Sequence, residues 1–337
     1  MGGFIEEIPR RPGPIEGVAV STAGFAGPEG PEAPVVVTGV PELAAVLGDA
    51  VAAPVGRMVT GFFANGGRRA VVTRALAGLD AIDDVALLCP LPEDRAEAIA
   101  RCERRRDRLA ILSLPAALAD AAAVLATRPA EPSPFAALHH PWVRACGELT
   151  PPGGHVAGLY ARSDEEQGVA HAPTNLSLRG VDAQPLERVL ADREIEQLGA
   201  GAVNVLRLVR GGVRVWGART FTSDAEWKYV NVRRLMMFLE SSIDRGLQWA
   251  VFEPNAEPLW GDVRRLVEDF LLRCWRDGNL RGNRADDAFF VRCDRSTMTQ
   301  DDLDNGRLVC VVGVAPVKPA EFVIFRIGLW TADRPDP

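Results

Sequence analysis

The sequence lacks any long uninterrupted apolar run, although 47% of its 337 residues are hydrophobic. A bilayer-spanning helix needs about 20 consecutive, mostly apolar residues, so we expect no direct membrane insertion. The first residues, MGGFIEEIPRRPGP, contain two glutamates and no apolar signal core. A myristoylation site would also need Ser or Thr at the position of Glu6. These absences predict a product that folds and assembles in the cytoplasm.

Histidine and cysteine are few and scattered. The six cysteines include no C-x-x-C pair, so we interpret them as buried, reduced thiols: Cys89, Cys102, Cys146, Cys274, Cys293 and Cys310. A metal site made by His139, His140 and an acid is an alternative. However, adjacent residues of a strand point to opposite faces, so we favour ordinary buried histidines and predict no metal site.

Familiar catalytic motifs are also missing. The sequence has no GxxxxGK[ST] loop, no GxGxxG after a strand, no HExxH and no GxSxG. The glycine-rich stretch 151–158 resembles a phosphate loop but has no lysine or hydroxyl partner at a fixed spacing. Adjacent acids such as Asp286-Asp287 do not converge on one point and are interpreted as solvated turns. We therefore predict no catalytic residue and no cofactor, and the chain is not expected to be an enzyme.

Excess positive charge is absent as well. The chain carries 38 basic and 45 acidic residues, which gives a net charge of -7. Nucleic-acid binding requires a basic face that displaces counterions from phosphates. No nucleic-acid partner is therefore expected.

What the chain does contain is an alternation of strand and helix patterns, which predicts an α/β layer. Strands are predicted over 18–27, 34–39, 70–74, 85–90, 108–115 and 135–145, and helices from 41 and over 92–105, 116–127 and within 151–168. Residues 203–219 contain two apolar runs around Gly211-Gly212 and predict a hairpin. Further on, helices are predicted over 231–246 and 258–275, and strands over 249–254, 288–293, 307–316 and 321–329. The buried stripe of the helix over 258–275 is expected to be Val263, Leu266, Val267, Phe270, Leu271 and Cys274.

The two ends of the chain are unusual. Residues 4–8 predict a short strand, and the prolines that follow cannot continue it. Residues 321–327 predict another short strand after the proline-bearing stretch VKPAE. Proline-rich connectors are extended and fairly stiff, so neither strand has an obvious partner within its own chain. This pattern favours pairing with another subunit.

Several segments, taken in order, resemble the contractile tail sheath family of phage tails, R-type bacteriocins and extracellular contractile injection systems. They are HHPWV (139–143), PPGGHVAGLYARSDEEQGV (151–169), APTN (172–175), VRVWGART (213–220), EWKYVNVRRL (226–235), QWAVFEPNAEPLW (248–260), AFFVRCD (288–294) and GVAPVKPAEFVIFRIG (313–328). The sequence departs from the family pattern in HHPW, where tyrosines are common, and in the short segment 125–135. This short segment lacks the outer insertions of the larger sheath proteins, which favours an injection system.

The resemblance implies a compact outer α/β domain over 18–225 and an inner conserved domain over 226–316 with a mixed sheet flanked by helices. It also implies arms over 1–17 and 317–337 that donate strands to neighbouring subunits. The donated strands would be Phe4, Ile5, Glu6, Glu7 and Ile8, and Glu321, Phe322, Val323, Ile324, Phe325, Arg326 and Ile327. The accepting sheet would include Phe289, Val291, Leu308, Val309 and Val311.

Such a subunit would form a helical homo-oligomer around an inner tube protein, with baseplate and cap proteins at its ends. Contraction from a metastable extended state would drive the tube through a target envelope. Candidate tube-facing residues are Asp301, Asp302 and Asp304 in the acidic turn 299–305, and Arg264 and Arg265 on the helix over 258–275. The alternatives are a sheath-terminating cap protein of the same machine and an α/β enzyme without a recognisable catalytic motif.

Overall fold

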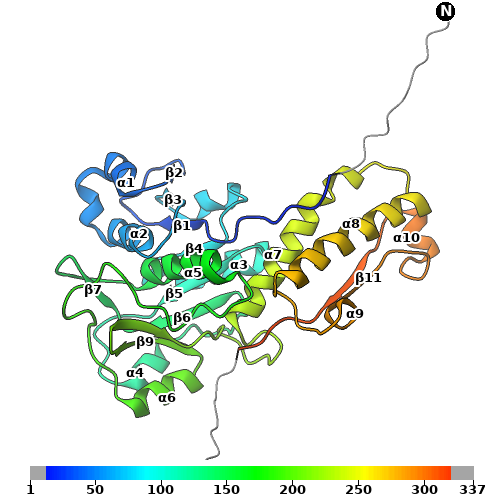
Figure 1. Cartoon of the computed structure of the whole chain (residues 1–337). Coiled ribbons are helices and arrows are strands. Elements are labelled where there is room, and N and C mark those ends of the chain that lie inside the picture. Colours follow the sequence, from blue (N-terminus) through cyan, green and yellow to red (C-terminus); the bar gives the residue numbers. More distant parts are fainter. Residues whose placement is uncertain (1–12, 320–337) are drawn as a thin grey trace, which may run out of the picture.

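An eight-stranded mixed sheet forms the larger part of the molecule (Figure 1), and the computed structural model describes residues 13–319. The strand order is β10-β9-β6-β5-β4-β1-β3-β2. Its strands are β1 (Ala23–Ala26), β2 (Val35–Val37), β3 (Ala70–Thr73), β4 (Leu87–Cys89), β5 (Leu109–Ser113), β6 (Ala136–His140), β9 (Val203–Val209) and β10 (Gly212–Trp216). The six central strands from β9 to β3 run parallel, whereas β2 and β10 pair antiparallel at the two edges. Parallel strands are buried on both faces, which accounts for their nearly continuous apolar sequences.

Helices cover both faces of this sheet. They are α1 (Val40–Leu47), α2 (Pro54–Ala64), α3 (Arg95–Arg105), α4 (Ala121–Ala126), α5 (Gly153–Gln167) and α6 (Asp192–Ala200), with 3₁₀ turns η1 (Gly48–Ala52), η2 (Leu76–Ala81) and η3 (Pro92–Asp94). Helix α2 packs against α5, and α4 packs against α6. A small hairpin, β7 (Val143–Ala145) and β8 (Glu148–Thr150), lies beside them. We call the large sheet with these covering elements the sheet body.

The glycine-rich stretch of α5 serves close helix packing. A Cβ atom on Gly154 would lie 2.0 Å from the carbonyl oxygen of Met58 in α2, and one on Gly158 would lie 2.2 Å from that of Phe62. At the same helix start, the N–H of Gly153 donates to the hydroxyl of Ser113 over 3.1 Å. The stretch that resembled a phosphate loop in the sequence therefore brings two helix backbones into contact.

A second unit projects from the sheet body (Figure 1). It contains α7 (Val230–Gly246), η4 (Gln248–Ala250), α8 (Glu257–Arg276), α9 (Ala285–Ala288), β11 (Phe289–Arg292), α10 (Gln300–Asp304) and β12 (Val311–Val314), and we call it the C-terminal unit. The predicted stripe of α8 is buried at all six positions, which confirms that face as core. Among residues 13–319, no helix is both long and apolar enough to span a membrane.

Four predicted elements differ from the observed ones. The strand predicted over 249–254 is wrong: η4 is followed by a loop in which the Phe252 side chain is fully exposed and its φ is +72°. The strand predicted over 135–145 is divided into β6 and β7, because Pro141 has no N–H to continue the ladder. The helix predicted from residue 116 begins at Ala121, where the Asp120 carboxylate accepts the N–H of Ala123 at the N-cap. The strand predicted over 307–316 is reduced to β12.

Arg234 joins the two units. Its guanidinium donates to the two carboxylate oxygens of Asp164 in α5 over 2.8 and 2.5 Å and to the carbonyl of Val20 over 3.0 Å. Both charged side chains are buried. Burial raises the pKa of Asp164, and the charge and hydrogen bonds of Arg234 oppose that rise. One ion pair thus ties α7 to the sheet body and to the incoming N-terminal segment.

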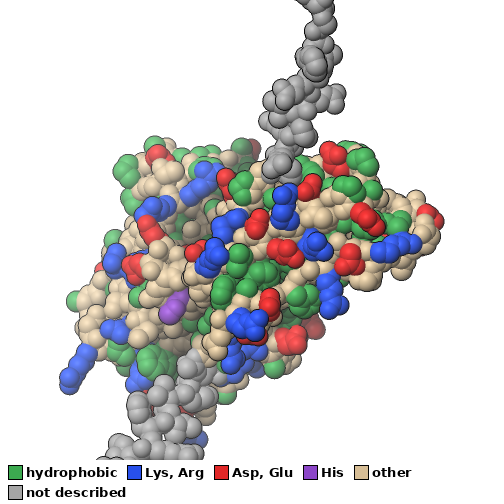
Figure 2. Space-filling view, turned by 45° about the vertical axis from the view of Figure 1, so that its right-hand side comes forward, with side chains coloured by type: hydrophobic (Ala, Val, Ile, Leu, Met, Phe, Trp, Pro, Cys, Tyr) green, Lys and Arg blue, Asp and Glu red, His purple; other side chains and the backbone are tan. Residues whose placement is uncertain are grey.

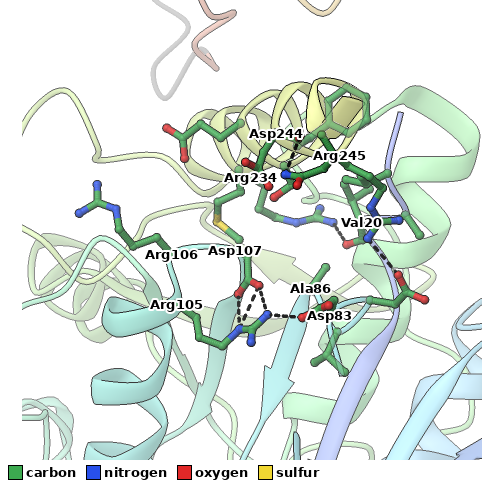
Figure 3. A pocket seen from close by; sticks show the side chains of 18 residues that line it. Val20, Asp83, Ala86, Arg105, Arg106, Asp107, Arg234, Asp244 and Arg245 are labelled. Carbon is green, nitrogen blue, oxygen red and sulfur yellow. Dashed lines mark hydrogen bonds and ion pairs between the residues drawn. The ribbon is translucent and has the colours of Figure 1, made fainter. Parts of the chain in front are cut away.

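The interface around Arg234 is only partly filled. A cavity of about 520 Å³ lies between α7 and the edge of the sheet body (Figure 3). Arg245 of α7 reaches across to Asp84, with 3.2 Å between Nη2 and Oδ1, and Arg105 is held by Asp83 and Asp107 on the opposite side. Polar contacts around a hollow therefore link the two units, together with Val230 and Met237 of α7, which pack into the core of the sheet body.

Three buried histidines lie in the sheet body. His139 and His140 are in β6 and His155 is in α5, and burial lowers the pKa of each imidazole to about 4. The Nε2 of His139 lies 3.4 Å from the hydroxyl of Tyr160. Neither ring nitrogen of His140 has a hydrogen-bond partner within the described part of the chain. All three are neutral core residues near pH 7.

Candidate assembly interface

Strands β11 and β12 form a small antiparallel sheet in the C-terminal unit. Phe289 lies opposite Val314, Val291 opposite Val312, and Arg292 opposite Val311. Within residues 13–319 no further strand pairs with this sheet. A two-stranded sheet is at best marginally stable by itself and needs packing or additional strands. This sheet packs on α8 and leaves its outer edges open.

The register shows which backbone groups are open. The N–H of Ala315 donates to the carbonyl of Ala288 over 2.8 Å, so this pair is hydrogen-bonded across the strands. In an antiparallel ladder, hydrogen-bonded and non-hydrogen-bonded pairs alternate. The backbone groups of residues 311 and 313 therefore form hydrogen bonds with β11, whereas Val312 and Val314 direct their N–H and C=O groups away from β11. The outer edge of β12 can accept another strand.

The two faces of this sheet differ. Phe289 and Val291 pack toward α8, together with Val312 and Val314. On the opposite face, Phe290 is 51% exposed and Val311 is 42% exposed. The Phe290 ring lies over Gly313, with the guanidinium of Arg292 5.6 Å from the ring centroid. Figure 2 shows hydrophobic side chains among mixed charges on the side of the molecule that includes the C-terminal unit.

Leu308 and Val309, predicted as part of the accepting sheet, lie just before β12. Both pack against a small core formed by the start of α8 and residues 293 and 298. The carbonyl of Val309 accepts the hydroxyl of Thr297 over 2.7 Å. In this chain they support the sheet from its end, outside its ladder.

The acidic turn forms the short helix α10, and Arg307 pairs with two of its three aspartates. Thr299 caps α10, and its hydroxyl accepts the N–H of Asp302 over 3.1 Å. Asp302 accepts from Arg307 over 2.8 Å, and Arg307 also pairs with Asp301. The hydrogen bonds from Thr299, followed by that from Arg307, lower the pKa of the Asp302 carboxyl to about 2. Asp304 accepts the side-chain amide of Gln300 over 2.7 Å.

The two predicted arginines occupy the first half of α8. Arg265 pairs with Asp262 over 2.7 Å, whereas Arg264 lies 3.9 Å from Glu268. Leu303 of α10 packs on the same small core as Val263 of α8. The structure thus brings all five predicted tube-facing residues to the same end of the C-terminal unit (Figure 1), with much of their charge already paired.

The described chain begins and ends near opposite ends of α7. Ile15 is 2% exposed, and its side chain packs against the backbone of Gly246 in α7. The carbonyl of Ile15 accepts a hydrogen bond from the guanidinium of Arg273 over 2.7 Å. Near the other end of α7, Asn231 donates to the carbonyl of Val317 over 2.9 Å. Residues 13–17, predicted as part of the first arm, therefore lie against their own C-terminal unit. The predicted strands 4–8 and 321–327 lie outside the described residues.

Sequence analysis missed two features of this surface. The exposure of Phe252 was hidden because an apolar run with an aromatic residue resembles a buried strand. The ion pair between Arg234 and Asp164 was also missed, because adjacent arginines on a helix are usually exposed to solvent. The apolar positions around Arg234, at Val232 and Leu235, were the available signal that part of this helix turn is enclosed.

Comparison with known proteins identifies the family. A model of the phage tail sheath protein central domain matches residues 89–221, and a model of the phage tail sheath C-terminal domain matches residues 222–329. Together they run without a gap over most of the chain. This chain belongs to the contractile tail sheath family, whose members are structural sheath proteins.

Individual relatives agree with the family models. The sheath of the extracellular contractile injection system PVC, in its contracted state, has 29% identity and a TM-score of 0.90 and covers 99% of this chain and 97% of that chain. The contracted helical sheath of the anti-feeding prophage has 26% identity and a TM-score of 0.82, covering 98% and 99%. A putative prophage major tail sheath protein of Pseudomonas aeruginosa is 28% identical over 180 residues, 52% of this chain. That match spans only 45% of the prophage protein.

Proposed function

We propose that this chain is the repeating subunit of a contractile sheath. Copies assemble in the cytoplasm as stacked rings around an inner tube, between a baseplate and a terminating cap. The extended sheath is metastable, and its contraction drives the tube through a target envelope. The full-length similarity to two contracted sheaths of tail-like particles carries this proposal.

The work would come from repacking identical subunits. Two packings of one chain can differ in free energy while a kinetic barrier holds the less stable one. Catalytic turnover has no place in this mechanism. The charge-paired end formed by α10 and the start of α8 is the proposed contact with the tube, which requires Asp301, Asp302, Asp304, Arg264 and Arg265 to face it.

Strand exchange is proposed to connect the subunits. Residues 4–8 and 321–327 would add to the β11–β12 sheets of neighbouring copies. The open outer edge of β12 supports this, because main-chain hydrogen bonds to an unpaired edge provide affinity. The anchors at Ile15 and Val317 support it too, since they start the two arms at opposite ends of a 17-residue helix, about 25 Å apart.

Each arm by itself would bind weakly. A net contribution of roughly 0.5–1.5 kcal/mol per hydrogen bond gives a five-residue strand only a few kcal/mol. Two arms per subunit, repeated through a helical polymer, give avidity without requiring any single strong contact. Such a network can shear during contraction and stay connected.

Deletion of residues 1–8 tests the arm. We expect a folded, soluble monomer that no longer forms striated tubes, as seen by negative-stain electron microscopy. The substitution Val312→Pro is the matched test of the acceptor, because it removes an outward N–H and edge strands tolerate proline. Long tubes from either variant would contradict strand exchange.

The cap protein is the second candidate. A sheath protein expressed alone should form long contracted tubes, whereas a terminating cap should form single rings or monomers. Expression of the full-length chain without partners therefore distinguishes the two. An α/β enzyme would require turnover that disappears on changing one specific residue.

A further inference from the structure

We propose that Cys293 and Cys310 form an intramolecular disulfide when the protein meets an oxidising thiol–disulfide couple. The bond would join the end of β11 to the start of β12 and close the segment 294–309, which contains α10. The proposal rests on strand register and on the burial of the two side chains in the same small core. It concerns a modification site separate from the strand edge.

The register places the two residues opposite each other. Arg292 faces Val311 in the ladder, so the next residue outward on each strand is a cysteine. The Ala288–Ala315 hydrogen bond makes 292/311 a hydrogen-bonded pair and 293/310 a non-hydrogen-bonded pair. Cα atoms of such a pair are about 4.5 Å apart, which lies inside the range of about 4.4–6.8 Å found for disulfides.

The side chains of Cys293 and Cys310 pack in the same small core. Cys293 is buried and Cys310 is half-buried, and both belong to the small core with Val263 and Met298. A side-chain hydrogen bond from Cys310 lowers the pKa of Cys293, and the same interaction, followed by burial, raises the pKa of Cys310. The hydrogen bond from Thr297 to Val309 keeps the strands together beyond the ladder. The register and the shared core therefore place the two thiols on neighbouring strands, facing the same side.

The reaction is a thiol–disulfide exchange with a small disulfide such as oxidised glutathione. One thiolate of the pair attacks the glutathione disulfide and releases one glutathione thiolate, which leaves a mixed disulfide. The second thiolate then displaces the remaining glutathione and forms the bond between Cys293 and Cys310. The protein loses two protons and two electrons, and the glutathione disulfide is reduced to two thiols. The exposed part of Cys310 is the access route for the oxidant.

Peptide mapping after oxidation tests the proposal. The full chain with Cys146→Ser, which removes the exposed thiol, is incubated with oxidised glutathione and digested with trypsin without reduction. We expect two thiols to be lost and the tryptic peptides 293–295 and 308–326 to be recovered joined, separating after reduction. Recovery of the two peptides unlinked, whether free or each carrying glutathione, overturns the proposal.

Two variants control for chemistry elsewhere. In the same background, Cys274→Ser removes a buried thiol of α8 outside the pair and should still lose two thiols. Cys310→Ser should form no internal disulfide, and its thermal midpoint should not rise on oxidation, whereas that of the parent should. If Cys310→Ser does not fold, the peptide map of the parent still decides the question.

One consequence rests on the proposed function. A sheath released from a reducing cytoplasm would acquire this bond outside the cell and fix the strands that accept its neighbours' arms. Assembled tubes would then resist dissociation by denaturant more when oxidised than when reduced. If the protein forms tubes but the two peptides are not linked after oxidation, only the disulfide is refuted. If the peptides are linked but no tubes form, only the proposed sheath assembly is refuted.

Discussion

The sheet body and the C-terminal unit differ in how completely their strands are buried. The sheet body surrounds its parallel strands with helices, and β1, β3, β4, β5 and β6 are buried along their whole length. In the C-terminal unit, by contrast, β11 and β12 pack one face on α8 and expose Phe290 and Val311 on the other. The first region encloses its central strands within one chain. The second leaves the outer backbone edge of β12 and the side chains of one face available for a partner.

This contrast explains how one chain can be both stable and ready to assemble. Most of the buried apolar surface lies in the sheet body, and the open edge of β12 lies in the region proposed to receive strands. A destabilising change in the sheet body should therefore act on the monomer, whereas a change in the β11–β12 sheet should act mainly on assembly. The following predictions test that division.

The largest effect is expected in the core of the sheet body. Phe62 is fully buried and packs edge-on against Phe25, with 5.7 Å between ring centroids. Phe62→Ala should lower the free energy of unfolding by about 3–5 kcal/mol, because a cavity replaces the ring. Chemical denaturation of the monomer measures this. A loss below about 1 kcal/mol would show that the sheet body is not the main source of stability.

The joint between the two units should rank next. Arg234→Met leaves Asp164 buried without its partner, and we expect a loss of about 3 kcal/mol, at the lower end for broken buried pairs because Asp164 can take up a proton. Arg245→Met is the matched control, since its pair with Asp84 is exposed and should contribute less than about 1 kcal/mol. Similar losses from both variants would contradict the role of Arg234 as the joint.

Acid should weaken the sheet body through its buried histidines. Burial lowers the folded-state pKa of His140 to about 4, whereas an unfolded chain titrates near about 6.5. The unfolded state alone therefore takes up protons between those values, so stability present above pH 6.5 is lost progressively toward pH 4. Between pH 7 and 5 this histidine should account for about 2 kcal/mol.

Substitution isolates this histidine contribution. His140→Phe should flatten the pH dependence of the free energy of unfolding, because the apolar ring takes up no proton. His171→Phe, at an exposed position, should leave the slope unchanged. An equal slope in all three proteins would rule out His140 as the source.

The smallest effect on the monomer is expected at the exposed aromatics. Phe252→Ser should change the free energy of unfolding by no more than about 0.5 kcal/mol, because its side chain is fully exposed. Phe290→Ser should cost about 1 kcal/mol, because this side chain is half-buried. Tube formation, measured by sedimentation, should nevertheless decrease if these side chains contact neighbours. Unchanged assembly with both variants would remove this face from the interface.

Much of the fold could be predicted because its signals are local. The apolar stripe of α8 and the hairpin at Gly211-Gly212 are both confirmed. The wrong strand over 249–254 shows the limit of such signals. Hydrophobicity predicts burial only on average. Here φ is positive at Phe252 and no strand between residues 13 and 319 pairs with the run, so Val251 and Phe252 are exposed.

The assembly surface could be predicted only in part. The segment containing β11 and β12 is recognisable from its apolar residues and its resemblance to sheath proteins. Which edge is open, and that Leu308 and Val309 lie outside the ladder, depends on register. The two arms, the tube contact and the boundaries at residues 17, 225 and 316 stay predictions.

The sequence by itself determined the alternation of strands and helices and the faces that α8 and the central strands bury, because these follow from the order and periodicity of residues close together along the chain. It also determined the family, through the resemblance of several segments to sheath proteins. Only the tertiary structure decided that Arg234 meets Asp164 and that Cys293 faces Cys310. These pairs are separated by 70 and by 17 positions, and only the packing of whole elements brings residues so far apart in sequence into contact.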